Sequence, residues 1–229
     1  MSSIVETNHP VTLVGGGAAT EADLHEALSL APTLVAADGG AGLALSAGVV
    51  PEAVIGDFDS ITADALSRIP DDRLHRIAEQ DSTDFDKALR SISAPIVLAV
   101  GFTGARMDHQ LAVLHTLVRR PASTCILIGE TEAGFLCPEH INLDLGPGDV
   151  LSLFPLGPVT GRSTGLRWPI DGLSFDPMHQ IGTSNEATGP VELWMDQAAM
   201  IAFVPRRVLP DLMQALLRAD QGAPWPARA

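Results

Sequence analysis

The first half of the sequence contains aspartates whose placement suits a divalent cation. Asp57 and Asp59 are separated by one residue in the segment Gly56-Asp57-Phe58-Asp59-Ser60. In an extended chain, two such side chains point the same way and their Cα atoms lie about 6.5 Å apart. Carboxylates this close repel each other unless a cation lies between them, and Mg²⁺ prefers hard oxygen ligands. The pair therefore predicts a magnesium site, with a solvated acidic turn as the alternative.

Three further aspartates strengthen the prediction of a metal site, because each of them also follows a short apolar run. These residues are Asp38, Asp84 and Asp108. The carboxyl ends of parallel strands meet at one edge of a sheet, where ligands bind, so all of these carboxylates are expected to converge there. Several unpaired carboxylates at one edge would be costly without a cation.

Side chains that could bind phosphate lie next to these aspartates. Arg106 precedes Asp108 by two residues, and its guanidinium could hold phosphate oxygens at two points. Lys87 is the only lysine and lies three residues after Asp84 on a predicted helix, so it could pair with that carboxylate or reach a phosphate. Thr83 has the spacing of a helix N-cap, which is its structural alternative.

A dinucleotide-binding oxidoreductase is a competing hypothesis. Gly15 and Gly17 follow the first apolar run, and Asp38 follows the second, where such folds place the acid that binds ribose. However, Thr20 replaces the third glycine of G-x-G-x-x-G, and the later aspartates would have no role. A non-catalytic nucleotide-sensing module is also open. A P-loop enzyme is excluded, because Lys87 does not lie in G-x-x-x-x-G-K-[ST].

The elements that must position these residues alternate regularly as far as residue 128. Short apolar runs alternate with stretches whose apolar residues recur every three or four positions, which is typical of strands and helices wound around a parallel sheet. The predicted strands are residues 11–14, 33–37, 53–55, 73–77, 96–100 and 124–128, and the predicted helices are residues 21–30, 63–68, 83–91 and 108–118. We therefore predict an α/β fold, with a doubly wound parallel-sheet domain over residues 1–129.

After Gly129, glycines and prolines recur every few residues, and short apolar stretches follow one another with no helix between them. This pattern predicts a smaller antiparallel β-sandwich over residues 130–206. Its predicted strands are residues 141–145, 150–154, 191–195 and 200–204. An amphipathic stretch over residues 209–217 predicts a helix within a C-terminal helix and tail, residues 207–229.

The composition limits the classes of partner. With 28 acidic and 14 basic residues the net charge is -14, which argues against a nucleic-acid surface, so a nucleotide is expected to arrive with a metal. The apolar runs are far shorter than the roughly 20 residues that span a bilayer, and the first residues show no export signal. We therefore expect a cytoplasmic enzyme. Cys125 and Cys137 fit neither a zinc ribbon nor a disulfide scaffold.

Taken together, the aspartate segments resemble the thiamine pyrophosphokinase family. The segments that carry the resemblance are residues 37–41, 56–60, 80–84 and 104–109, and their order and spacing agree with the family from Val11 to about Leu117. Farther on, residues 164–168 and 182–186 resemble the two segments of the family's C-terminal sandwich that touch thiamine.

The resemblance implies Mg²⁺-dependent transfer of a diphosphoryl group from ATP to thiamine, which gives thiamine diphosphate and AMP. It implies a homodimer, in which the sandwich domain helps to complete the partner's thiamine pocket.

The expected metal ligands are Asp57, Asp59 and Asp84, which act in catalysis with Arg106 and Asp108. The expected ATP-binding residues are Asp38, Gly39, Gly40, Gln80, Thr83, Lys87 and Arg106. The expected thiamine-binding residues are Trp168, Ser184 and Asn185, with Trp168 stacked on the ring or, alternatively, part of the core. A pyrophosphokinase for another alcohol, such as a pterin, is the nearest alternative.

Overall fold

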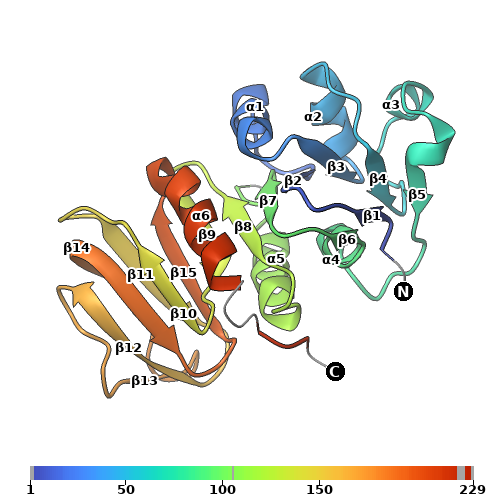
Figure 1. The fold of residues 1–229 in the computed structure, drawn as a ribbon. Coiled ribbons are helices and arrows are strands. Elements are labelled where there is room, and N and C mark those ends of the chain that lie inside the picture. Colours follow the sequence, from blue (N-terminus) through green and yellow to red (C-terminus); the bar gives the residue numbers. More distant parts are fainter. Residues whose placement is uncertain (1–2, 105, 221–224, 228–229) are drawn as a thin grey trace. The chain divides into compact units, whose positions relative to one another are not determined.

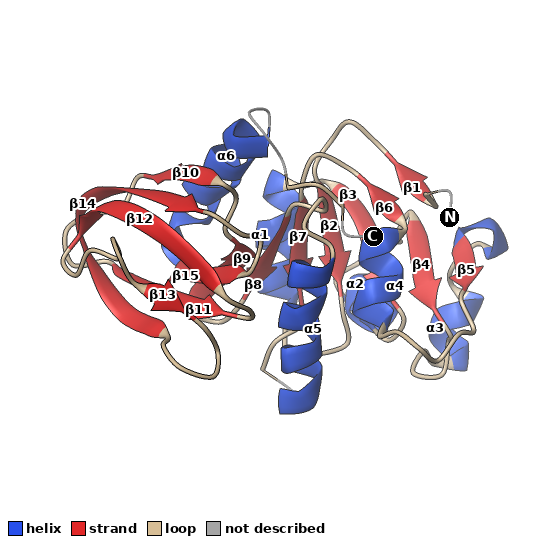
Figure 2. Ribbon diagram, turned by 90° about the horizontal axis from the view of Figure 1, so that it is seen from below, coloured by secondary structure: helices blue, strands red, loops and turns tan. Residues whose placement is uncertain are grey.

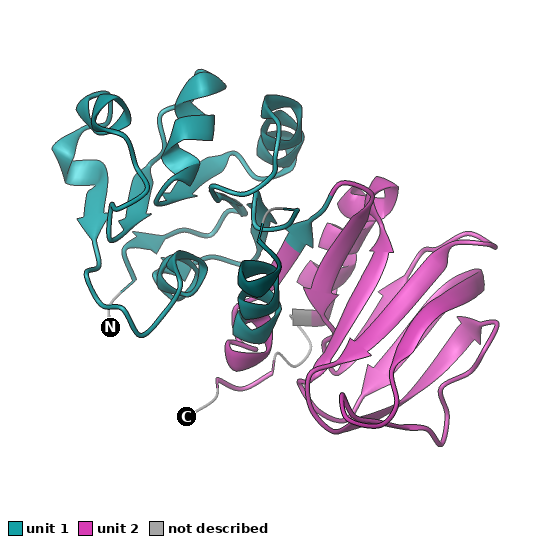
Figure 3. Ribbon diagram, turned by 180° about the vertical axis from the view of Figure 1, so that it is seen from behind, with its two compact units in different colours: residues 1–116, 127–129 teal, residues 117–126, 130–229 magenta. Residues whose placement is uncertain are grey.

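The computed structural model describes residues 3–104, 106–220 and 225–227. It has a mixed α/β fold with a large β-sheet (Figure 1). Two compact units are present, residues 1–116 with 127–129 and residues 117–126 with 130–229 (Figure 3). None of the helices in the described part of the chain is long and apolar enough to cross a membrane.

The first unit is built on parallel strands in the order β5-β4-β3-β2-β7. Nearly every side chain of the central strands is buried, which explains their continuous apolar sequences. The bounds of the strands are β2 (Val11–Val14), β3 (Thr33–Ala37), β4 (Ala53–Gly56), β5 (Leu74–Arg76) and β7 (Val97–Val100). The next strand in the sequence is β8 (Cys125–Ile128), and the short β1 (Val5–Glu6) pairs with β6 (Ile92–Ser93).

Helices cover both faces of these parallel strands (Figures 1 and 2). One face carries α1 (Glu21–Leu30), α2 (Gly40–Ser46) and α3 (Ala63–Ser67), and the other carries α4 (Asp84–Arg90) and α5 (Met107–Arg119). A short 3₁₀ turn, Asp71–Arg73, precedes β5. Each of the helices α1, α3 and α4 begins after a threonine N-cap. The hydroxyl oxygen of the cap accepts a hydrogen bond from a backbone N–H that would otherwise be unpaired, and the caps are Thr20, Thr62 and Thr83.

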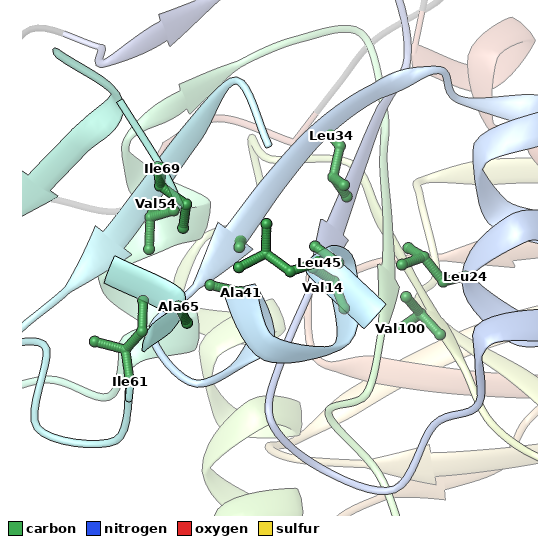
Figure 4. Close-up of a cluster of buried hydrophobic side chains, with 12 residues drawn as sticks. Val14, Leu24, Leu34, Ala41, Leu45, Val54, Ile61, Ala65, Ile69 and Val100 are labelled. Atoms are coloured by element: carbon green, nitrogen blue, oxygen red, sulfur yellow. The ribbon is translucent and has the colours of Figure 1, made fainter. Parts of the chain in front are cut away.

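A core of buried aliphatic side chains fixes the first face (Figure 4). Leu34 and Val54 of the sheet pack with Leu24 of α1 and Leu45 of α2. Burying a side chain of this size contributes about 2 kcal/mol of hydrophobic stabilisation. The strand ends that carry the polar residues are therefore held on a rigid base.

The second unit is antiparallel throughout, in the order β13-β12-β14-β11-β15-β9. The long strand β14 changes partners along its length: its first part pairs with β11, and its later part pairs with β12 and β10. The strands are β9 (Glu132–Leu136), β10 (His140–Leu143), β11 (Val150–Pro155), β12 (Val159–Leu166), β13 (Ser174–Phe175), β14 (Gly182–Met195) and β15 (Met200–Pro205).

A 3₁₀ turn, Arg206–Val208, leads into α6 (Leu209–Asp220), which packs on β10. Much of the tail predicted after this helix, residues 221–224 and 228–229, lies outside the described residues.

Candidate active site

A cavity of about 580 Å³ opens at the carboxyl ends of the parallel strands of the first unit. Its volume lies in the range of small-molecule sites, roughly 300–1,000 Å³. Many of the site residues predicted for this unit line it, namely Asp38, Gly39, Asp57, Asp59, Gln80, Thr83, Asp84, Lys87 and Arg106. Gly40 is instead buried in the packing of α2 on β2, where an added Cβ would lie 2.2 Å from the carbonyl oxygen of Val14.

Asp38 directly follows β3 in a left-handed backbone conformation, with φ of 42°, and its side chain is buried. The amide of Ser60 donates a hydrogen bond of 3.2 Å to Asp38 Oδ2. The other oxygen, Oδ1, is buried and has no hydrogen-bond partner among the described residues. Gly56 leaves room for this carboxylate, since a Cβ at Gly56 would lie 2.8 Å from the Cβ of Asp38.

The buried position of Asp38 changes its acidity. Burial raises the pKa of Asp38 from 3.8 to about 6. The hydrogen bond from Ser60 opposes this rise in pKa, and the negative charges of Asp84, Asp59 and Asp57 add to it. A buried carboxylate with an unpaired oxygen and acidic neighbours is the environment that a bound cation would relieve.

Asp38, Asp57 and Asp59 form the acidic cluster of the cavity, and one carboxylate oxygen from each lies within 4.8 Å of the others. The backbone does not bring Asp57 and Asp59 together in the extended form that the sequence suggested. Phe58 has a φ of 69°, so the chain turns there, and the amide of Asp59 donates to Asp57 Oδ1 over 3.3 Å. The close oxygens and the unpaired Asp38 Oδ1 fit a hard divalent cation such as Mg²⁺.

Lys87 supplies a positive charge beside this cluster. Its side chain is 2% exposed, and its ammonium Nζ lies 3.1 Å from both Asp57 Oδ2 and Asp84 Oδ1. Burial alone would lower the pKa of Lys87, but hydrogen bonds to the two carboxylates outweigh it and raise the pKa. Burial likewise opposes the ionisation of Asp57, yet the bond from Lys87 brings the pKa of Asp57 below its usual value. The lysine therefore pairs with Asp84, one of the two predicted options, and with Asp57 as well.

The loop between β5 and α4 contributes two more predicted residues. Gln80 Nε2 donates to Asp57 Oδ2 over 3.2 Å. Thr83 caps α4, because its hydroxyl oxygen accepts a hydrogen bond of 3.3 Å from the amide of Asp86. The structural role expected for Thr83 is therefore present, and its side chain also borders the cavity.

Arg106 and Asp108 pair with each other at the start of α5. The distances are 2.6 Å from Nη2 to Oδ2 and 3.2 Å from Nε to Oδ1, and the side chains are 70% and 64% exposed. The hydrogen bond from Arg106 lowers the pKa of Asp108. Arg106 borders the cavity, and so does Gln110, one helical turn later, which was not predicted from the sequence. Its four-residue spacing from Arg106 is the signal that could have identified it.

In the second unit, the residues expected to touch thiamine form a small group. Asn185 Oδ1 accepts from the amide of Trp168 over 3.2 Å, and Asn185 Nδ2 donates to the carbonyl of Trp168 over 2.7 Å. The indole of Trp168 is 55% exposed, so it is not a core residue. The guanidinium of Arg167 lies 5.0 Å from the indole ring centre. Ser184, with φ of 61°, donates its amide to Ser152 Oγ.

Two family models match the chain in sequence order. The model described as "Thiamin pyrophosphokinase, catalytic domain" matches residues 24–128, and the model described as "Thiamin pyrophosphokinase, vitamin B1 binding domain" matches residues 139–198. Together they match well over half of the chain. The chain belongs to the thiamin pyrophosphokinase family. The acidic cluster, Lys87 and Arg106 all lie in the range of the catalytic-domain model, and Trp168 and Asn185 lie in that of the second model.

Curated members of the family support this assignment. Thiamine pyrophosphokinase 1 of Arabidopsis thaliana is 29% identical over 155 residues, which cover 59% of this chain. The chain spans 58% of the length of that relative. Thiamine pyrophosphokinase of Bacillus subtilis is 37% identical over 91 residues, 37% of this chain and 42% of that protein.

Solved structures of thiamin pyrophosphokinases share the fold. The enzyme from Candida albicans superimposes with a TM-score of 0.73 at 17% identity, over 86% of this chain and 89% of that one. The enzyme from Bacillus subtilis superimposes with a TM-score of 0.71 at 22% identity, over 86% of this chain and 98% of that one.

Proposed function

We propose that this chain is a thiamine pyrophosphokinase, which transfers the diphosphoryl group of ATP to the hydroxyl of thiamine and releases AMP. The observation that carries the proposal is the cavity of the first unit, where three carboxylates converge within 4.8 Å beside Lys87 and Arg106. Phosphoryl transfer requires little covalent chemistry from a protein and much positioning and charge neutralisation.

The acidic residues would hold Mg²⁺. We propose Asp57, Asp59 and Asp84 as metal ligands, although Asp84 lies outside the close cluster of Asp38, Asp57 and Asp59. We add Asp38 to the proposal because its buried Oδ1 has no partner within the described chain. Mg²⁺ bound by these residues would supply charge neutralisation for the phosphates and would help to orient the transferred group. Since Lys87 engages one oxygen of Asp84, the second oxygen of that carboxylate is the one left for the metal.

The nucleotide would occupy the rest of the cavity. Gly39 lets the backbone approach the phosphates, and Gln80, Thr83 and Lys87 border the same space. Gly40 contributes to nucleotide binding indirectly, through the close packing of α2 on β2. These residues bind and orient ATP, so that its middle phosphate faces the acceptor hydroxyl.

Arg106 and Asp108 would exchange partners during the reaction. Their ion pair is highly exposed, so breaking it costs little, and a phosphate then takes over the two-point contact of Arg106. Asp108, once released, accepts the proton of the thiamine hydroxyl. Asp84 is the alternative acceptor for this proton.

The second unit would bind the thiamine rings. The exposed indole of Trp168 offers a flat surface for stacking, and Ser184 and Asn185 belong to the same group. We further propose a division of roles: residues 1–129 form a doubly wound nucleotide-binding catalytic domain, and residues 130–206 form a β-sandwich that binds thiamine and joins the subunits of a homodimer. A cytoplasmic location accords with these substrates.

Product analysis tests the proposal. Incubation with ATP, Mg²⁺ and thiamine should form AMP and thiamine diphosphate in equal amounts. Formation of ADP would contradict the chemistry, and nucleotide binding without turnover would favour a sensing module. A pterin alcohol in place of thiamine should give no product, which separates this activity from related pyrophosphokinases.

A further inference from the structure

The loop over residues 78–82 lies between β5 and α4 and carries Gln80 to the acidic cluster. No backbone-to-backbone hydrogen bond involves these residues in the described part of the chain. Regular bonding ends before the loop, where the amide of Ile77 donates to Gly56, and resumes after it, where the amide of Lys87 donates to Thr83. The conformation of the loop therefore depends on its side chains.

Glu79 is the anchor of this loop. Its Oε1 accepts a hydrogen bond of 2.6 Å from Ser82 Oγ, within the loop, and one of 2.5 Å from Arg90 Nη2, in the last turn of α4. These two donors hold the pKa of Glu79 below its usual value, so the carboxylate is ionised. Charge-assisted hydrogen bonds of this kind are roughly twice as strong as neutral ones.

The side chain of Arg90, which holds Glu79, is itself fixed by burial and by a contact with Asp86. Its side chain is only 17% exposed, and Nη1 lies 3.8 Å from Oδ2 of the buried Asp86 on the same helix. The same helix, α4, presents Asp84 and Lys87 to the cavity. Glu79 thus links the loop to the helix that carries the other cavity residues, although neither Glu79 nor Arg90 is among the described residues that line the cavity.

We infer that the Glu79–Arg90 ion pair positions Gln80 against Asp57 and thereby shapes the metal-nucleotide site. Glu79 acts through Gln80, whose amide donates to Asp57 Oδ2. Groups that hydrogen-bond a metal-ligating carboxylate orient it, and their loss reduces metal affinity about 10- to 100-fold. The inference rests on the proposed function, because it takes Mg²⁺-bound ATP as the ligand.

The test measures binding of the Mg²⁺-bound α,β-methylene analogue of ATP by calorimetry, in the absence of thiamine. Glu79→Ala should weaken binding about 10-fold or more. Glu52→Ala is the matched control: Glu52 pairs with Arg73 at 3.8 Å in the same unit, away from the cavity lining, so binding should match wild type. Glu79→Gln keeps an acceptor for Ser82 but loses the charge, and it should give an intermediate loss.

Additional readouts separate positioning from a general loss of stability. Thermal melting of the metal-free variants should show that Glu79→Ala and Glu52→Ala both remain folded at the temperature of the binding measurement, and the KM for thiamine should stay close to that of wild type. Because Glu79 and Arg90 act as one unit, the double variant Glu79→Ala/Arg90→Ala should bind no more weakly than Arg90→Ala alone.

Analogue binding by folded Glu79→Ala that equals wild type would overturn the inference. Additive losses in the double variant would also overturn it. If Glu79→Ala yields no folded protein, Glu79→Gln carries the test, and wild-type affinity in that variant would equally overturn the inference. Wild-type protein that binds no analogue would overturn the proposed function itself, and this inference with it.

Discussion

Lys87 and Asp57 are 30 residues apart in the chain, yet Lys87 Nζ donates a hydrogen bond of 3.1 Å to Asp57 Oδ2. The same ammonium group reaches Asp84 Oδ1, and the lysine side chain is almost completely buried. Lys87 therefore acts as an internal cation for a strongly acidic site. It holds two of the proposed metal ligands in fixed positions within the protein itself.

Replacement of Lys87 by methionine should destabilise the metal-free protein. The change leaves Asp57 and Asp84 without their counter-charge. Because these carboxylates are 12% and 35% exposed, the cost should lie somewhat below the roughly 3–5 kcal/mol of a fully buried pair. Chemical denaturation in EDTA measures the loss of unfolding free energy, and added Mg²⁺ should restore part of it. Arg68→Met, which removes an exposed ion pair with Asp64 and a hydrogen bond of 3.4 Å to the Leu45 carbonyl, should change stability by only about 1 kcal/mol or less. Equal stabilities of Lys87→Met and wild type would contradict the role of Lys87.

The raised pKa of Asp38 predicts how the stability of the folded protein depends on pH. Its pKa is about 6 in the folded protein and 3.8 ordinarily, so the folded state binds the proton more tightly than the unfolded state. The penalty for the buried charge is full above pH 6, shrinks as the pH falls through 6, and vanishes below 3.8. Asp38→Asn, which is neutral throughout, should therefore be more stable than wild type at about pH 8 in EDTA. This advantage should diminish steadily as the pH falls from about 7 to about 4.

The same variant should respond less to metal. Saturating Mg²⁺ should raise the melting temperature of wild type more than that of Asp38→Asn, because the variant lacks one proposed ligand. If the difference in unfolding free energy between Asp38→Asn and wild type does not vary with pH, Asp38 is not a buried, ionised carboxylate at neutral pH.

Substitutions of Asn185 and Trp168 should weaken the binding of thiamine without changing the binding of ATP. Asn185 holds both backbone polar groups of Trp168, so Asn185→Ala should misplace the indole, and Trp168→Ala should remove it. Loss of a stacking contact predicts a rise in the KM for thiamine of about 10-fold, with ATP affinity unchanged. Steady-state kinetics with each substrate varied in turn measures both effects. A matching loss of ATP affinity would argue against this division of roles.

The strands of the first unit were predictable because parallel strands that are buried on both faces have continuous apolar sequences. The predicted runs 11–14 and 33–37 coincide with β2 and β3. In contrast, α2 was not predicted, because Gly40 and Gly42 have low helix propensity. The structure shows why Gly40 is needed there: its Cα packs directly against the backbone of β2.

The second unit was predicted less completely for a related reason. In β12 the buried positions hold Gly161 and Ser163 as well as Val159, so the strand lacks strong apolar alternation. The first part of β14 is largely exposed and polar, and the sequence predicted only its apolar end, residues 191–195. Pairing with neighbouring strands stabilises β12 and the first part of β14, although their own sequences show only a weak strand pattern.

Sequence patterns identified many of the residues that line the cavity, but few of the contacts between them. The residue types and the strand ends were sufficient to choose Asp38, Asp57 and Asp59. The contacts of Lys87 with Asp57 and of Glu79 with Arg90 depend on how separate segments pack, and the left-handed turn at Phe58 depends on local conformation. Spacing along the chain carries no information on these features.

Isotope transfer tests directly whether an intact diphosphoryl group moves from ATP to thiamine. With ATP labelled by ³²P at the β-phosphate, together with Mg²⁺ and thiamine, the label should appear in thiamine diphosphate while AMP is unlabelled. Asp57→Asn should abolish most of this transfer. Label that stays in a nucleotide as ADP, or full transfer by Asp57→Asn, would rule out diphosphoryl transfer at this acidic cluster.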